Sequence, residues 1–189
     1  GKLQGTAQTF LNLQTADFGF LLIDARNAFN EQNREAMLWH VRHKWPSGAR
    51  FTFNCYQYWG TLVIRGAAGT GVVLYSMEGV TQGDPLAMFV YGIGMLPLTR
   101  LIKVRAPDAL TPWYADDAAA MAKFARISAV YDLVKEYGPR YGYFPESSKS
   151  ILVVTPGNRA GAEAEFAHRG FKVVEGSRYL GGFIGGARE

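Results

Sequence analysis

Two adjacent carboxylates stand inside an otherwise apolar segment of this 189-residue chain. Asp116 and Asp117 occur within TPWYADDAAAMAKF, residues 111–124, whose pattern predicts a short strand, a turn and a second strand. Like charges in contact repel each other, and burying either carboxylate without a partner is costly. The segment therefore indicates that a cation lies between these side chains.

A third carboxylate completes the candidate site. Asp24 ends the apolar run FGFLLID, residues 18–24, which is typical of a buried strand. If this strand and the hairpin with Asp116 and Asp117 are neighbours in one sheet, three carboxylates meet at one edge. Oxygen ligands at that density suit Mg²⁺, and two such ions roughly 4 Å apart can activate a hydroxyl and stabilise a leaving phosphate. A single Asp at a strand end is more often a turn residue, so the argument depends on the combination.

A glycine-containing loop is the second candidate feature. The segment EGVTQGDPL, residues 78–86, has a glycine near each end, so its backbone can approach a bound molecule closely. Gln82 offers both a donor and an acceptor, and the helix predicted after it directs its N-terminus back at the loop. Such a loop can hold a nucleotide and a template against a sheet. Taken alone, the pattern is more typical of a simple turn that starts a helix.

The composition is that of a folded domain of enzyme-like character. Hydrophobic residues make up 48% of the chain, aromatic residues 14% and charged residues 19%, which excludes a disordered protein. The net charge of +4 is spread along the chain and is compatible with a polyanionic partner without requiring one. Cys55 is the only cysteine, which excludes a disulfide framework and indicates a reducing compartment. The longest uncharged run, residues 85–99, is interrupted by glycine and proline and predicts a buried helix.

The elements that must position these residues can be predicted from periodicity and end signals. Asn30 is the predicted N-cap of the first helix, and Asp84 caps a later helix that has a proline at its start. The hairpins favour an antiparallel sheet with helices packed on one face, in an α+β fold. In chain order we expect a strand at 18–24, helices at 30–45 and 49–60, a hairpin at 62–79, a helix at 84–104, a strand-turn-strand at 111–121, a helix at 125–142, a strand at 149–155, a helix at 158–170 and a hairpin at 171–185.

Three motifs together resemble those of reverse transcriptases. DARNAF, GVTQGDPL and YADD occur in this order and at these spacings, and the set looks most like non-LTR retrotransposon enzymes, with group II intron and retron enzymes as relatives. The resemblance covers nearly the whole chain, residues 1–189, as the polymerase palm. It implies that the N-terminal part of the fingers and the thumb belong to a longer parent chain.

The resemblance implies an RNA-directed DNA polymerase that uses two Mg²⁺ ions, with Mn²⁺ as a substitute. The primer 3′-hydroxyl would attack the α-phosphate of a dNTP, and pyrophosphate would leave. Asp24, Asp116 and Asp117 match the metal-binding acids of the family, and Ala25 beside Asp24 is assigned to the same metal and substrate site. Lys149, in YGYFPESSKS, matches the lysine that approaches the triphosphate and can act as a general acid.

The resemblance also implies a set of substrate-binding residues. Phe29 stands five residues after Asp24, where the family places an aromatic ring that would collide with a ribose 2′-hydroxyl. Without the surrounding motif, Phe29 would be a core residue at a strand–helix junction. The remaining matches are Gln82, Gly83 and Tyr114 near the nucleotide, template and primer end, and Tyr179, Leu180 and Gly181 in the hairpin that grips the primer strand.

The expected partners are an RNA template, a DNA or RNA primer and dNTPs, with no membrane, in an intracellular location that is either nuclear or cytoplasmic. Two alternatives stay open. The first is an RNA-dependent RNA polymerase palm, against which Phe29 argues. The second is a catalytically inactive palm-like fragment that binds nucleic acid; such fragments usually lose their acids, and all three acids are present here.

Overall fold

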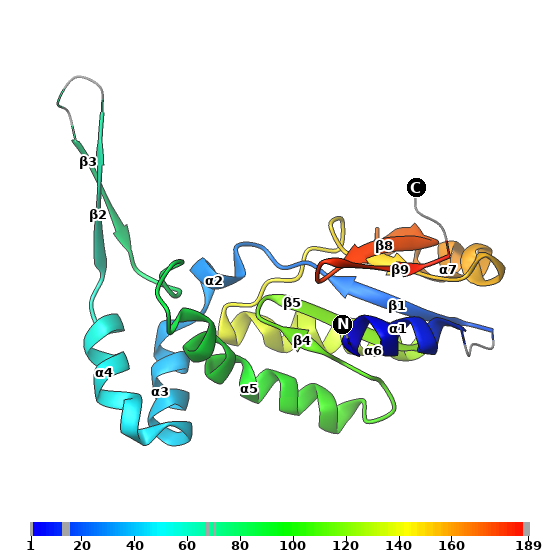
Figure 1. Cartoon of the computed structure of the whole chain (residues 1–189), viewed down its shortest axis with the longest axis horizontal. Helices are drawn as coiled ribbons and strands as arrows, with labels where there is room; N and C mark the ends of the chain where they lie inside the picture. Colours follow the sequence, from blue (N-terminus) through cyan, green and yellow to red (C-terminus); the bar gives the residue numbers. More distant parts are fainter. Residues whose placement is uncertain (1, 13–15, 67–68, 70, 187–189) are drawn as a thin grey trace. The chain divides into compact units, whose positions relative to one another are not determined.

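The computed structural model describes residues 2–12, 16–66, 69 and 71–186 of the chain (Figure 1). Its internal contacts divide the chain into two compact units, and each is described by itself below. The first unit comprises Gly1–Arg26, Leu98–Gly138 and Phe144–Glu189, and the second comprises Asn27–Pro97 and Pro139–Tyr143.

A five-stranded sheet with the order β4-β5-β1-β6-β7 is the centre of the first unit. The central strand β1 (Phe18–Ile23) is antiparallel to β5 (Asp117–Lys123) and to β6 (Ile151–Val153). At the edges, β4 (Trp113–Tyr114) is antiparallel to β5, and β7 (Lys172–Val174) is parallel to β6. The apolar run of β1 is explained by its place, since both faces of this strand are covered.

Helix α6 (Phe124–Tyr137) covers one face of this sheet. Its buried residues, including Ile127, Val130 and Val134, recur at the helical period and form one apolar stripe. The strand positions that alternate toward this face of β5 are alanines such as Ala120, which is fully buried. These small side chains allow the helix to lie close against the strands.

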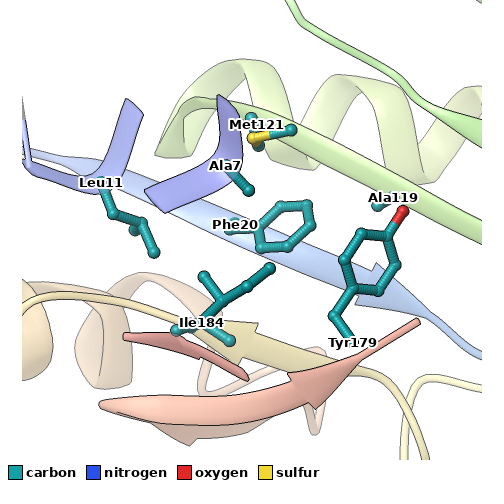
Figure 2. Packing of buried hydrophobic residues seen from close by; sticks show 8 residues of the cluster. Ala7, Leu11, Phe20, Ala119, Met121, Tyr179 and Ile184 are labelled. Atoms are coloured by element: carbon teal, nitrogen blue, oxygen red, sulfur yellow. The ribbon is translucent and has the colours of Figure 1, made fainter. Parts of the chain in front are cut away.

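Helix α1 (Lys2–Asn12) and the hairpin of β8 (Gly176–Tyr179) and β9 (Gly182–Gly185) cover the opposite face. Phe20 of β1 lies at the centre of the packing in Figure 2, between the helix and the hairpin. The sequence did not predict α1, because Gly5 and two threonines lower its helix propensity. The buried cluster consists of Ala7, Leu11, Phe20, Ala119, Met121, Val153, Tyr179 and Ile184.

The second unit is built from helices and one hairpin. Its hairpin matches the predicted one, although residues 67, 68 and 70 of the turn lie outside the described residues. The N-terminal part of α5 also belongs to this unit. The elements are α2 (Ala28–Glu31), α3 (Arg34–Lys44), α4 (Pro46–Tyr56), β2 (Gly60–Arg65), β3 (Gly71–Ser76) and α5 (Ala87–Arg105).

Two predicted helix starts were wrong. Asn30 is not the N-cap, because the predicted helix is divided into α2 and α3; Asn33 caps α3, and its Oδ1 accepts the N–H of Ala36 at 2.7 Å. Helix α4 begins at Pro46 rather than after the Pro-Ser-Gly break. Proline suits the first turn of a helix, where its missing N–H costs nothing, so this residue starts a helix instead of separating two.

The predicted terminal hairpin was correct only in its second part. Residues 172–174 form β7 in the main sheet, and only residues 176–185 pair with each other as β8 and β9. Between α6 and β7 lie two 3₁₀ turns, Gly138–Tyr141 and Pro156–Asn158, and helix α7 (Arg159–Phe166). The α+β class with a mainly antiparallel sheet is confirmed, with one parallel pair at the edge.

Helix α5 is the one described helix that is long and apolar enough, by length and composition, to cross a membrane. The core helix of a folded domain passes the same test. Val90, Leu98 and Ile102 of α5 are fully buried within the chain, in keeping with the buried helix that its sequence predicts.

Candidate active site

Asp24 directly follows β1 and Asp117 begins β5, so the two acids lie near each other at one end of these paired strands. The antiparallel register of β1 and β5 pairs Ile23 with Ala118, and one further step along both strands brings Asp24 close to Asp117. Residues at such neighbouring positions point to the same face of a sheet. By alternation this is the face of Phe20, which α1 and the β8–β9 hairpin cover.

Asp116 lies beside this pair in the turn between β4 and β5. Tyr114 pairs with Asp117, so Ala115 and Asp116 form a two-residue turn. Ala115 has a φ of 54°, in the left-handed region that costs a residue with a Cβ about 1 kcal/mol or more. Strained backbone of this kind is concentrated at functional sites, and here it holds an acid at the end of a strand.

The three carboxylates affect one another electrostatically. Partial burial raises the pKa of Asp117 above its ordinary value, and the charges of Asp116 and Asp24 raise it further. Partial burial also raises the pKa of Asp24; Lys149 opposes this rise, while Glu146 and Asp116 add to it. Mutual repulsion therefore disfavours the fully ionised cluster unless positive charge is added.

The donor chemistry of this cluster fits Mg²⁺. Within the described ranges, no group of three or more His, Cys, Asp or Glu side chains is placed so that it could hold a metal ion by itself. Mg²⁺ is usually held by one or two carboxylates together with water and substrate phosphates rather than by an all-protein cage. The residues that could hold such ions are Asp24, Asp116 and Asp117.

A turn that follows Pro145 is attached to Asp24. The carbonyl of Asp24 accepts the N–H of Glu146 at 2.8 Å, and Ala25 forms an isolated antiparallel bridge with Pro145. Lys149 on the same turn is exposed, and its Nζ lies 2.6 Å from a carboxylate oxygen of Glu146. The hydrogen bond and the charge of Glu146 raise the pKa of Lys149, so its ammonium stays protonated at neutral pH.

A groove of about 770 Å³ lies between these charged residues and the β8–β9 hairpin. Asp24, Asp117 and Lys149 line one part of it, and the residues from Gly176 to Phe183 line the other. Carboxylates and an ammonium group therefore share one hollow with the residues of a hairpin.

Tyr179 anchors this hairpin. Its ring meets Phe20 edge-on at 5.2 Å between centroids, and its side chain is buried. Burial, with a smaller contribution from the charge of Asp117, raises the pKa of Tyr179 to about 12. Its hydroxyl has no hydrogen-bond partner among the described residues. Leu180 and Gly181 form the turn, both with positive φ, as two-residue hairpin turns of the mirror-image type require.

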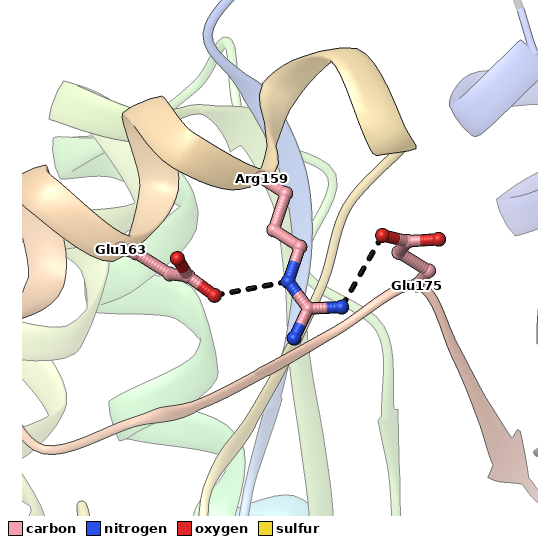
Figure 3. A network of polar contacts seen from close by, with 3 residues as sticks. All are labelled: Arg159, Glu163 and Glu175. Carbon is pink, nitrogen blue, oxygen red and sulfur yellow. Dashed lines mark hydrogen bonds and ion pairs between the residues drawn. The ribbon is translucent and has the colours of Figure 1, made fainter.

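A polar network joins the start of this hairpin to helix α7 (Figure 3). Arg159 Nε lies 2.9 Å from a carboxylate oxygen of Glu163, and its Nη1 lies 3.2 Å from one of Glu175, directly before β8. Partly exposed ion pairs are individually weak, so the network restrains the hairpin without dominating its stability.

One further sequence-predicted residue lies beside the acids, and three lie in the second unit. Tyr114 is exposed and sits in β4 beside Asp117. The other three belong to the second unit: the ring of Phe29 packs on Tyr91 with centroids 4.6 Å apart, and Gln82 and Gly83 are exposed in the loop before α5. The structure thus groups Asp24, Asp116, Asp117, Lys149, Tyr179, Leu180 and Gly181 within one unit.

Sequence reasoning missed the role of Arg34, which connects two loops of the second unit. In the second unit, the buried side chain of Arg34 donates hydrogen bonds to the carbonyls of Gly79 at 3.1 Å and Glu78 at 3.0 Å. Arg34 also reaches the carbonyls of Tyr58 and Ser76, so it joins the base of the β2–β3 hairpin to the loop with Gln82. These partners lie 24 to 45 residues away in the chain, and no local pattern signals them.

Comparisons with known proteins find likeness at the level of fold. No protein-family model matches the chain, and no curated protein matches its sequence. Telomerase structures match: apo telomerase from Candida tropicalis, truncated from its C-terminal domain, has a TM-score of 0.62 and 14% identity over 80% of this chain and 34% of that chain. Telomerase from Candida albicans, in complex with the TWJ fragment of telomeric RNA, has a TM-score of 0.57 and 13% identity over 83% of this chain and 30% of that chain.

The chain has a reverse-transcriptase-like fold. Telomerase is a reverse transcriptase, and at this low identity the likeness shows the fold alone. The chain spans about a third of the length of these telomerases. The narrower resemblance to non-LTR retrotransposon, group II intron and retron enzymes stays a prediction.

Proposed function

We propose that this chain is the palm of an RNA-directed DNA polymerase that adds deoxynucleotides to a primer 3′-hydroxyl. The observation that carries the proposal is the juxtaposition of Asp24 and Asp117 across β1 and β5, with Asp116 in the adjoining turn, in a reverse-transcriptase-like fold. Three acids at one sheet edge are unfavourable without a cation, and two of them, Asp24 and Asp117, line a groove that can take a charged polymer.

In the proposed reaction, the primer oxygen forms a bond to the α-phosphorus while the bond to the β-phosphate oxygen breaks. The departing pyrophosphate takes that electron pair, and the proton of the primer hydroxyl passes to water. Asp24, Asp116 and Asp117 would hold two Mg²⁺ ions, which supply the positive charge that activates the hydroxyl and stabilises the leaving group. Lys149 stays protonated beside the groove and can donate a proton to the departing oxygen.

The β8–β9 hairpin is proposed to hold the primer strand. Tyr179, Leu180 and Gly181 form the wall opposite the carboxylates, and Arg178 adds a positive charge to the same groove. The Candida tropicalis and Candida albicans telomerase structures that contain the TWJ fragment of telomeric RNA support a nucleic-acid partner for this fold. We therefore propose an RNA template, a DNA or RNA primer and dNTPs as substrates.

The second unit is proposed to select the nucleotide. Phe29 would exclude a ribose 2′-hydroxyl, and Gln82 and Gly83 would lie near the nucleotide and template. Gln82 and Gly83 are exposed, and Gly83 has a φ of 93°, which frees its backbone to approach a ligand closely.

RNA-templated primer extension in the full-length protein tests the proposal. With Mg²⁺ or Mn²⁺ we expect extension with dNTPs, and we expect Asp116→Ala to lower the rate by about 10³-fold or more, since the metal-binding acids act as a unit. The matched control is Asp108→Ala, because Asp108 is exposed and pairs with Arg126 at 2.8 Å. The control variant should stay within about twofold of the wild-type rate, since exposed ion pairs contribute little.

Two outcomes would contradict the proposal. Efficient extension with rNTPs instead of dNTPs would favour the RNA-dependent RNA polymerase. RNA binding without any extension in either metal would favour a non-catalytic nucleic-acid-binding domain.

A further inference from the structure

The buried hydroxyl of Ser150 connects two main-chain groups of the candidate site. Ser150 is fully buried, and its Oγ donates a hydrogen bond to the carbonyl of Glu146 at 2.8 Å. The same Oγ accepts the N–H of Asp24 at 3.3 Å. The carbonyl of Asp24 accepts the N–H of Glu146 at 2.8 Å, so both main-chain polar groups of Asp24 are held by one turn.

The turn that holds Asp24 also carries Lys149. The N–H groups of Lys149 and Ser150 donate to the carbonyl of Glu146 at 3.2 and 3.0 Å, which closes residues 146–150 into a compact turn. The side chain of Lys149 pairs with Glu146 at 2.6 Å. The acid near Asp117 and the ammonium that lines the groove are therefore attached to the same small piece of backbone.

We propose that Ser150 is a positioning residue that locks Asp24 to the Lys149 turn, so that one buried hydroxyl sets the acid and the ammonium relative to each other. This inference rests on the proposed polymerase function. Ser150 itself reaches no substrate, because its side chain is fully buried.

The physical basis is the cost of losing this hydroxyl. A buried polar group is costly unless it is hydrogen-bonded, and the two partners of Ser150 Oγ both belong to the site. Alanine would leave the Asp24 N–H without its acceptor and free the turn to move. A displacement of a catalytic group by about 1 Å can cost about 10²-fold in rate, so a change in geometry should reach the chemistry.

The first test measures amide hydrogen exchange in the protein without metal or substrate. In Ser150→Ala we expect the Asp24 amide to exchange about five- to tenfold faster, while amides at the centre of β1 keep their wild-type rates. The matched control is Thr52→Ala, which removes another buried hydroxyl, bonded to the carbonyl of Gly48 at 3.0 Å in the second unit. Unchanged exchange at Asp24, or faster exchange along all of β1, would overturn the proposal.

The second test measures primer extension with both variants. We expect Ser150→Ala to lower kcat by about tenfold or more with a much smaller change in KM for dNTP, and Thr52→Ala to keep the wild-type kcat. The Lys149→Ala change should cost less in the Ser150→Ala background than in the wild type, because the lysine is already misplaced. The proposal would be overturned if Ser150→Ala had the wild-type kcat. It would also be overturned if the losses of kcat from Ser150→Ala and Lys149→Ala were additive in the double variant.

A second variant covers the case in which Ser150→Ala does not fold. Ser150→Cys fills the site but offers only a weak hydrogen-bond acceptor, so it should show the same fast exchange at Asp24 and the same loss of kcat. If Ser150→Cys behaves as the wild type in both tests, the proposal is wrong. Absence of extension by the wild type would instead count against the polymerase function, since the exchange test does not depend on activity.

Discussion

The β2–β3 and β8–β9 hairpins have opposite surroundings. The β2–β3 hairpin has an apolar sequence on both strands, yet its side chains are exposed, with Val63 at 63% and Ile64 at 55% of full exposure. The β8–β9 hairpin is shorter and rich in glycine, yet it buries Tyr179 and Ile184 against β1 and α1. The less apolar hairpin is therefore the one that belongs to a core.

This difference shows that apolar content does not decide whether a hairpin is packed into a core, because contacts with other segments of the chain decide it. Cross-strand pairs contribute only about 0.2–1 kcal/mol each, and an isolated two-stranded hairpin is marginal in water. Burying one large apolar side chain contributes about 1.5–3 kcal/mol. Ile184 and Tyr179 thus fix the hairpin that lines the groove, as a positioned wall requires.

The largest expected effect comes from a matched pair of isoleucines. Ile184→Ala should lower the free energy of unfolding by about 2–4 kcal/mol, because Ile184 is fully buried and the change leaves a cavity. Ile64→Ala, in the exposed hairpin, should change it by less than about 1 kcal/mol. Urea denaturation of both variants measures the difference. Equal losses would mean that the β2–β3 hairpin is buried in solution.

A matched pair of tyrosines gives the next effect. Tyr179→Phe removes a buried hydroxyl that has no partner among the described residues, and should raise the free energy of unfolding by about 1 kcal/mol. Tyr75→Phe, in the exposed hairpin, should leave stability within about 0.3 kcal/mol of the wild type. Thermal unfolding of the metal-free protein compares them. A loss of stability in Tyr179→Phe would show that this hydroxyl is bonded in solution.

A smaller effect concerns the charge that faces the packed hairpin. The folded-state pKa of Asp117 is raised, so folding favours the protonated side chain. The stability that this protonation contributes is present at low pH and is lost as pH rises through the folded-state pKa. Asp117→Asn should therefore stabilise the metal-free protein increasingly from about pH 4 upward, by about 0.5 kcal/mol at neutral pH, since solvent screens a partly exposed carboxylate.

Asp132 serves as a control because its pKa is shifted in the opposite direction from that of Asp117. Arg169 bonds Asp132 at 2.6 and 2.8 Å and lowers its pKa, so its stabilising contribution is present at neutral pH and is lost as pH falls through the folded-state value. Asp132→Asn should destabilise the protein at pH 7. Thermal unfolding from pH 4 to pH 8 measures both variants. The same pH trend in both would contradict the electrostatic description of the Asp117 site.

The smallest expected effect concerns the network at the start of the packed hairpin. Arg159→Gln removes the ion pairs to Glu163 and Glu175 and should lower the stability of the protein only slightly at low salt. The loss should disappear in 1 M NaCl, because salt screens exposed pairs. Chemical denaturation at two salt concentrations tests this. A loss that persists in high salt would show that Arg159 contributes through packing rather than charge.

Local signals allowed several parts of the fold to be predicted. The apolar run ending at Asp24 and the strand-turn-strand pattern around Asp116 specify a buried strand and a hairpin, because side-chain periodicity and turn chemistry act over a few residues. The predicted first helix failed at Asn30, since Asn30 lies inside the short helix α2, the chain leaves the helical conformation at Gln32, and Asn33 caps α3.

Long-range contacts could not be predicted. Helix α1 has weak intrinsic propensity and is supported by packing of Ala7 and Leu11 in the core of the first unit. Strand β7 pairs in parallel with β6 across an intervening helix, and no local pattern specifies that partner. Ser150 is an ordinary serine in the sequence, and only the fold brings its hydroxyl to Asp24, 126 residues away.

The sequence by itself therefore determined which residues carry charge, most of the segments that form strands and helices, and the order in which the acids occur. The tertiary structure alone decided that Asp24 lies near Asp117, that Glu146 and Ser150 hold the backbone of Asp24, and that the glycine-rich hairpin, rather than the apolar one, lines the groove. The physical reason is that propensity and turn chemistry act between near neighbours, whereas burial and opposed charges depend on segments that meet only after folding.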